Sequence, residues 1–112
     1  MALGSGKILN MEDLIKVLAR IELLAGKDVR QVPFISGYRP AFYFEGERTR
    51  ISGRIDLTDR DSFMPGTSGL VNIAFIKGMI DDSRFNPNEE FTFSEGRNVL
   101  GKGIIIERLN QK

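Results

Sequence analysis

The sequence predicts a small all-β barrel of six strands. Short segments rich in Val, Ile, Phe and Tyr recur along the 112 residues, and clusters of Gly, Pro, Asn, Asp and Ser separate them. Short strands with such turns between them are typical of β-barrels. Since 41% of the residues are hydrophobic, the chain can fill one core. We therefore expect a single barrel domain over residues 11–112, after a flexible N-terminal segment at residues 1–10.

The first element, between Asn10 and Leu24, fits two patterns. At helical spacing, one apolar face contains Leu14, Val17, Leu18 and Ile21. At a spacing of two residues, the apolar face of a strand contains Ile15, Val17, Ala19, Ile21 and Leu23. Intrinsic propensity alone favours the helix.

An aromatic strand follows after two less regular segments. Residues 25–28 are a turn signal, and residues 29–35 read as a short strand or extended segment. Pro33 interrupts this segment, which suits an edge or an irregular stretch. Residues 41–44 predict a strand because they are rich in aromatic side chains, and residues 45–47 predict a hairpin turn.

Alternation along the aromatic strand predicts which side chains enter the core. Phe42 and Phe44 should be buried and Tyr43 half-exposed. Residues 49–57 alternate between apolar and charged side chains and predict the next strand. Within it, the flexible backbone of Gly53 could hold a bulge or a tight bend.

The C-terminal half predicts three further strands, at residues 70–76, 90–93 and 100–109. Polar loops at residues 58–69 and 81–90 separate them.

The last predicted strand has two unusual features. Its isoleucine run, residues 104–106, suggests burial on both faces or closure of the barrel. Gly101 and Gly103 suggest a sharp bend or the close approach of another backbone.

Composition excludes several chemistries. The chain has no Cys and no His, so it has no disulfide, no thiolate nucleophile and neither of the commonest zinc ligands. Its acidic loops do not follow the spacing of a calcium-binding loop, so we expect no metal, no cofactor and no enzyme. A net charge of +1 excludes a strongly basic nucleic-acid binder but allows a local basic patch. Without a secretory signal or a bilayer-length apolar run, we expect a cytoplasmic protein with no membrane partner.

One motif carries a family resemblance: Gly37-Tyr38-Arg39-Pro40, then one residue, then Phe42-Tyr43-Phe44. It resembles the GYRP-x-FYF segment of the third domain of elongation factor Tu. Later segments are similar, in the same order, to that family's VTGTIEL, MPG, DDGLRF, FAIREG and TVGAG segments; they are Ile51 to Leu57, Met64 to Gly66, Asp81 to Phe85, Phe91 to Gly96 and Val99 to Gly103. The resemblance spans residues 16–109.

The resemblance implies a six-stranded antiparallel closed β-barrel with Greek-key connections. It also implies a strand at residues 16–24 in place of the helix, with room for a helical turn near residues 10–14. It implies no GTPase, because nothing else of the elongation factor is present.

In the elongation factor this domain contacts the backbone of tRNA, and the resemblance carries that site to Arg39, Ala41, Ser52 and Gly96. Arg39 can pair with phosphate and Ser52 can donate a hydrogen bond. Ala41 cannot donate, and Glu45 would repel phosphate. The alternative is a structural Arg39 that bonds turn carbonyls beneath Tyr38.

A basic patch is the second candidate site. Arg48, Arg50 and Arg54 have even spacing, so on a regular strand they would share one face. The alternative is an ordinary solvated face, paired with Glu45, Glu47 and Asp56. The complete set of candidate partner-binding residues is Arg39, Tyr43, Arg48, Arg50, Ser52, Arg54, Gly96 and Arg97.

These features predict a non-catalytic binding module that engages a protein partner or an RNA backbone. The resemblance suggests a GTPase-like domain, an exchange factor or a toxin as the protein, and tRNA as the RNA. The alternatives are a translation-factor mimic or immunity-like protein that captures a toxin or regulator, and a dissected domain of a divergent elongation factor. The sequence leaves the oligomeric state open.

Overall fold

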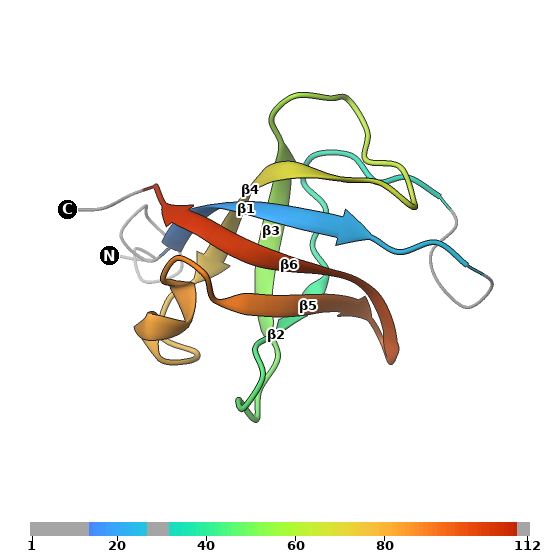
Figure 1. Ribbon diagram of the computed structural model, residues 1–112. Coiled ribbons are helices and arrows are strands. Elements are labelled where there is room, and N and C mark those ends of the chain that lie inside the picture. The colour runs from blue at the N-terminus through green and yellow to red at the C-terminus, as the bar shows by residue number, and fades with distance from the viewer. Residues whose placement is uncertain (1–13, 27–31, 110–112) are drawn as a thin grey trace, which may run out of the picture.

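Six strands close into one antiparallel barrel in the computed structural model, which describes residues 14–26 and 32–109 (Figure 1). The strands are β1 (Leu14–Leu23), β2 (Ala41–Tyr43), β3 (Ile51–Leu57), β4 (Ser68–Ile76), β5 (Glu90–Glu95) and β6 (Asn98–Arg108). The described part has no α-helix and a single 3-10 turn, η3 (Asp82–Phe85). The predicted fold class is confirmed, whereas the flexible segment predicted at residues 1–10 lies outside the described residues.

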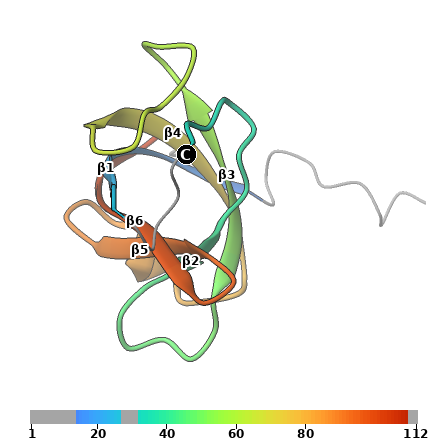
Figure 2. The ribbon, with the colours of Figure 1, turned by 90° about the vertical axis from the view of Figure 1, so that its right-hand side faces the viewer.

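The strand order produces Greek-key connections. Around the barrel the order is β1-β4-β3-β2-β5-β6, and β6 closes it on β1 (Figure 2). The strands β2, β3 and β4 are successive neighbours, while β1 lies beside β4 and not beside β2. Three consecutive strands with a fourth that returns beside them form a Greek key. A second one arises because β5 pairs with β2 on the other side.

The helical interpretation of the first element is wrong for the described residues, because Leu14–Leu23 is a strand. Its side chains alternate with a period of two, and the buried ones are Ile15, Val17, Ala19, Ile21 and Leu23. The strand pairs with β4 on one side and with β6 on the other, and this tertiary pairing outweighs the intrinsic propensity. The helical turn expected near residues 10–14 falls outside the described residues except for Leu14, which begins β1.

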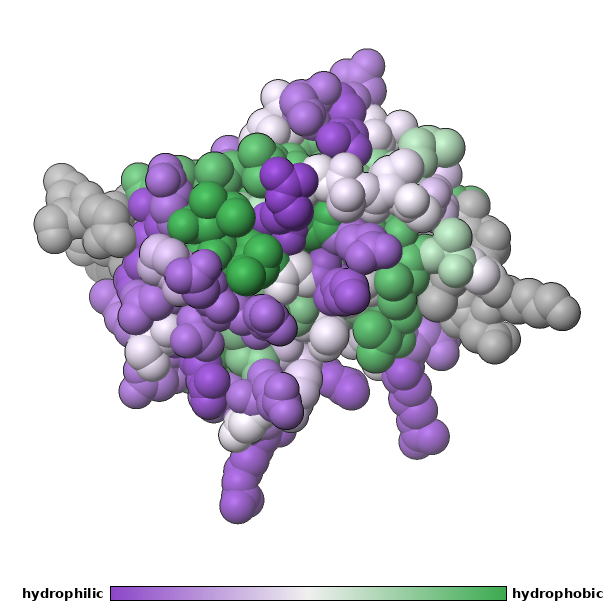
Figure 3. All heavy atoms as spheres, in the orientation of Figure 1, coloured by the Kyte–Doolittle hydropathy of each residue, from purple (hydrophilic) through white to green (hydrophobic). Residues whose placement is uncertain are grey.

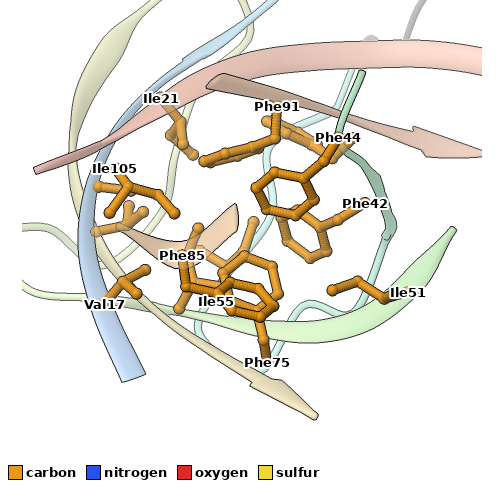
Figure 4. Packing of buried hydrophobic residues seen from close by; sticks show 14 of the residues in the cluster. Val17, Ile21, Phe42, Phe44, Ile51, Ile55, Phe75, Phe85, Phe91 and Ile105 are labelled. Atoms are coloured by element: carbon orange, nitrogen blue, oxygen red, sulfur yellow. The ribbon is translucent and has the colours of Figure 1, made fainter. Parts of the chain in front are cut away.

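Aromatic rings fill the centre of the core (Figure 4). The ring of Phe75 lies between 4.9 and 6.3 Å, centroid to centroid, from four others: Phe42, Phe44, Phe85 and Phe91. Tyr43 is half-buried between two buried neighbours, so the predicted alternation is confirmed. Within the predicted polar loop at residues 81–90, η3 turns the side chain of Phe85 fully into the core.

Gly53 does not form the expected bulge. The strand β3 pairs with β2 and β4 without a register shift. A Cβ at Gly53 would lie 2.8 Å from a ring carbon of Phe42 and 3.0 Å from one of Phe75. Glycine is therefore required here by ring packing and not by a bend.

The strand β6 closes the barrel on β1 but is not buried on both faces. Ile105 is fully buried, whereas Ile106 is 41% exposed. The close backbone approach expected at the two glycines is confirmed. A Cβ at Gly101 would lie 2.5 Å from the carbonyl oxygen of Glu22 in β1. A Cβ at Gly103 would lie 2.8 Å from the carbonyl oxygen of Arg20.

The segment before β2 belongs to no barrel strand: it forms two isolated bridges, with a turn at Ser36 and Gly37 between them. Phe34 forms an isolated bridge with Phe63, and the two rings stack at 5.3 Å. Pro33 lies in the irregular stretch, as expected, and residues 29–31 lie outside the described part. This segment leads the chain to the residues of the predicted site.

Candidate partner-binding surface

Tyr38 holds the backbone that carries Arg39. The Tyr38 carbonyl accepts a hydrogen bond from the N–H of Ile55 at 2.8 Å. Its ring stacks on Phe34 with centroids 4.5 Å apart, and its hydroxyl donates to Oε2 of Glu95 at 2.6 Å. These contacts reach β3 and β5, so they fix the chain between the two strands.

The strand register places Arg39 opposite Arg54. Tyr38 and Ala41 both pair with β3, and their two pairings belong to one antiparallel register. Two residues lie between them: Pro40 is buried, and Arg39 faces Arg54 on the outer side of the barrel. Arg39 and Ser52 are exposed and Arg54 is half-exposed, so two guanidinium groups and a hydroxyl share this side.

Gly96 and Arg97 form the turn that joins β5 to β6. Gly96 has a φ of +58°, the left-handed conformation that hairpin turns require and that glycine adopts without strain. On the strand next to this turn, Ala41 pairs with Ser52 on one side and with Ser94 on the other. The residues that the resemblance singles out therefore lie close together: Ser52 is on β3, Arg39 comes two residues before β2, and Gly96 directly follows β5.

Arg48 and Arg50 do not lie on the regular strand face that their spacing predicts. The strand β3 begins at Ile51, so both residues lie in the β2–β3 loop and only Arg54 is on the strand. The Nε of Arg54 lies 3.0 Å from Oδ2 of Asp56. This ion pair agrees with the solvated-face alternative for Arg54.

Glu47, another acidic partner expected for these arginines, is engaged elsewhere. Its Oε2 lies 2.8 Å from Nε of Arg84, and Oε1 of Glu89 lies 3.7 Å from NH1 of the same guanidinium. The hydrogen bond that Arg84 donates to Glu47 is the main cause of the raised pKa of Arg84. Arg84 thereby ties η3 to the β2–β3 loop.

Most of the candidate arginines have no counter-ion among the described residues. Within residues 14–26 and 32–109, no ion pair involves Arg39, Arg48, Arg50 or Arg97. In the same part of the chain, the Arg39 side chain also makes no hydrogen bond, so the structural interpretation of Arg39 gains no support. Exposed, unpaired guanidinium groups are free to meet a partner.

The acidic loop residues are held by local contacts. Asp81 accepts a hydrogen bond from the N–H of Ser83 at 2.8 Å, which lowers the pKa of Asp81. The Nε of Arg60 lies 2.8 Å from Oδ1 of Asp59 and lowers the pKa of that carboxyl. Among the described residues, no group of three or more His, Cys, Asp or Glu could hold a metal ion. None of the helices in this part is long and apolar enough to cross a membrane.

A second feature is one that no motif predicts. An open depression of about 670 Å³, called the furrow below, lies over β1, β2, β5 and β6. Its side chains include Arg20, Tyr43, Glu45, Glu90, Lys102 and Ile104. Tyr43 thus lines the furrow and does not lie beside Arg39 and Arg54. Alternation along each strand predicts that these side chains point outward. It does not predict that they are neighbours, because that depends on the register between strands.

The fold and these surfaces define a small, closed antiparallel β-barrel that presents unpaired arginines and a furrow to solvent. No protein-family model matches the chain. The assignment of the fold therefore rests on the strand order and pairing described above.

Proposed function

We propose that this protein is a non-catalytic binding module that engages a protein partner through one side of the barrel. That side, the arginine surface, comprises Arg39, Ser52, Arg54, Gly96 and Arg97. The supporting observation is that these residues come from three distant parts of the sequence and converge on β2, β3 and the β5–β6 turn.

The chemistry of the arginine surface suits carboxylates on a folded partner. Arg39 and Arg97 are exposed, and a guanidinium group binds a carboxylate through two parallel hydrogen bonds. Glu95 ends β5 beside the turn that carries Arg97, and its carboxylate disfavours a densely anionic ligand. A partner surface of mixed charge fits this arrangement better.

The resemblance to the third domain of elongation factor Tu agrees with this proposal. The closed barrel and its Greek-key connections are those that the resemblance implies. In that family the domain packs on a GTPase domain and contacts the nucleotide-exchange factor. We therefore propose a cytoplasmic partner of one of these kinds, or a toxin that targets the translation factor and is captured by a mimic of it.

An RNA backbone is the second candidate. Arg39, Ser52 and Gly96, which match the tRNA-contacting positions of the resemblance, lie on one surface. Phosphate contacts of this kind position a nucleic acid without reading its sequence. Ala41 and Glu45 weaken this candidate, because the first cannot donate a hydrogen bond and the second repels phosphate.

Capture from a host lysate tests the proposal. The wild-type protein and the control Lys77→Glu, an exposed position outside the surface, should retain the same partner. The double variant Arg39→Glu/Arg97→Glu should lose it while melting at nearly the same temperature, because both side chains are exposed and make no ion pair within residues 14–26 and 32–109.

Two results would count against this assignment. Retention of the partner by the double variant would move the interface elsewhere on the barrel. Loss of the partner on ribonuclease treatment, together with a gel shift of tRNA at about 50 mM salt, would favour the RNA candidate, because phosphate contacts are strongest at low salt.

A further inference from the structure

We propose that the furrow binds an extended peptide segment that carries a basic and an acidic residue about four positions apart, with an apolar residue between them. The furrow faces outward over β1, β6 and β5, where hydrophilic and hydrophobic residues meet in patches (Figure 3). This site is separate from the arginine surface, and the inference does not depend on the function proposed for that surface.

Two rows of outward side chains bound the furrow. The first row crosses β2, β5, β6 and β1 through successive pairing partners: Tyr43, Thr92, Lys102 and Glu22. The second row lies two residues away along the strands and contains Glu90, Ile104 and Arg20. Between the rows, the lining comes from residues whose side chains turn inward, or from glycine: Phe91, Gly103 and Ile21. The floor therefore consists of backbone and apolar atoms.

The charges of the furrow are sorted by sign along its length. At the β1 end, Arg20 makes no ion pair with any described residue, and neither do Glu90 and Glu45 at the other end. The β2–β5 register, carried past the end of β2, places Glu45 opposite Glu90. Lys102 and Glu22 lie 4.0 Å apart and offset each other. One end of the furrow is thus positive and the other negative.

The separation of the two ends sets the length of the ligand. Arg20, Ile104 and Glu90 stand on three successive strands, and Glu45 follows one strand further on. Three interstrand spacings amount to roughly 14 Å, and an extended peptide rises about 3.3 Å per residue. A basic and an acidic residue four positions apart therefore reach both ends.

Each part of such a peptide meets a complementary group. The acidic residue pairs with Arg20, and the ammonium group of the basic residue lies between Glu45 and Glu90. The central apolar side chain covers half-exposed Ile104 and the ring edge of Phe91, which line the furrow. A nucleic acid does not fit, because the two carboxylates repel phosphate at one end.

Titration of the isotope-labelled protein with synthetic peptides, followed by NMR, tests the proposal. The probes are acetyl-Lys-Ala-Leu-Ala-Glu-amide, the peptide of reversed order, and two peptides with Lys or Glu at both ends. One bipolar peptide should shift amide signals of β1, β5 and β6 and bind at least about five-fold tighter than the like-charged peptides, the scale of one exposed ion pair.

Charge reversal makes the test specific. Arg20→Glu should weaken binding of the preferred bipolar peptide about five-fold and improve binding of the peptide with two Lys residues. Glu90→Lys should improve binding of the peptide with two Glu residues. The matched control is Lys77→Glu, which reverses an exposed charge outside the furrow and should change nothing.

Three outcomes would overturn the proposal. They are equal binding of all four peptides, an absence of shifts in β1, β5 and β6 at millimolar peptide, and a peptide preference that Arg20→Glu leaves unchanged. All three variants replace exposed side chains without ion pairs among the described residues, so matching melting curves would show that each protein is folded.

Discussion

At the scale of single residues, glycine decides how tightly this barrel packs. Gly53 leaves room for two aromatic rings of the core. Gly101 lies between the ring of Phe93 and the main-chain carbonyl of Glu22, where a Cβ would meet both. One of these obstacles is backbone, which cannot rotate away, so Gly101 tolerates less change than a glycine that faces only side chains.

The change Gly101→Ala should destabilise the protein by about 1–3 kcal/mol, because the added methyl group forces β6 away from β1. Urea denaturation followed by circular dichroism measures this loss. Lys102→Ala is the control on the neighbouring, outward position, and it should change the free energy of unfolding by less than about 1 kcal/mol. Equal stabilities of the two variants would show that the strands have room to separate.

At the scale of elements, alternation in the sequence predicts strands well but does not exclude a helix where leucines also occupy the outer face. In β1, Leu14 and Leu18 add to the apolar residues at helical spacing, so the sequence fits a helix as well as a strand. The segment is a strand because it pairs with β4 and β6. The sequence places Arg48 and Arg50 on a strand for a related reason, although they lie in the loop before β3. A strand that begins at Ile51 cannot be distinguished by pattern from one that begins two residues earlier.

The turn η3 leads to a prediction about pH. Asp81→Ala removes the carboxylate that accepts the N–H of Ser83, so the melting temperature should fall by a few degrees at pH 7. The folded pKa of Asp81 is lowered, so its stabilisation is complete above the pKa of the unfolded chain and is lost as the pH falls through the folded value.

The difference in melting temperature between wild type and Asp81→Ala should therefore shrink in acid. The control is Asp82→Ala, which removes the neighbouring charge but no side-chain hydrogen bond of the described residues. At pH 7 the melting temperature of Asp82→Ala should lie closer to that of wild type than the melting temperature of Asp81→Ala does. A constant difference for Asp81→Ala across the titration would contradict the role given to this carboxylate.

At the scale of the whole molecule, a ring cluster centred on Phe75 holds the barrel together. This side chain is fully buried and meets rings from β2, β5 and η3. Phe75→Ala should cost about 3–5 kcal/mol, a large share of the 5–15 kcal/mol by which domains are usually stable. Chemical denaturation measures the cost, and Met79→Ala, at a half-exposed site, is the control that should have little effect.

The sequence predicts the existence of the barrel better than the location of its sites. Patterns of burial are local, so the strands and the buried Phe42 and Phe44 follow from alternation. The facing of Arg39 and Arg54, and of Glu45 and Glu90, depends on which residue of one strand meets which residue of another. Register of this kind results from the packing of the whole barrel, and no single segment encodes it.

The closure of β1 on β6 also determines how the barrel would respond to mechanical tension. Val17 pairs with Arg108, and the N–H of Leu109 donates to the carbonyl of Lys16, so the start of β1 and the end of β6 lie side by side (Figure 1). Force applied at these two ends would load the hydrogen bonds of the β1–β6 ladder one after another. These hydrogen bonds would therefore break in sequence. The barrel would open at a lower force than a barrel whose first and last strands are pulled parallel to each other, so that all the bonds between them are loaded at once.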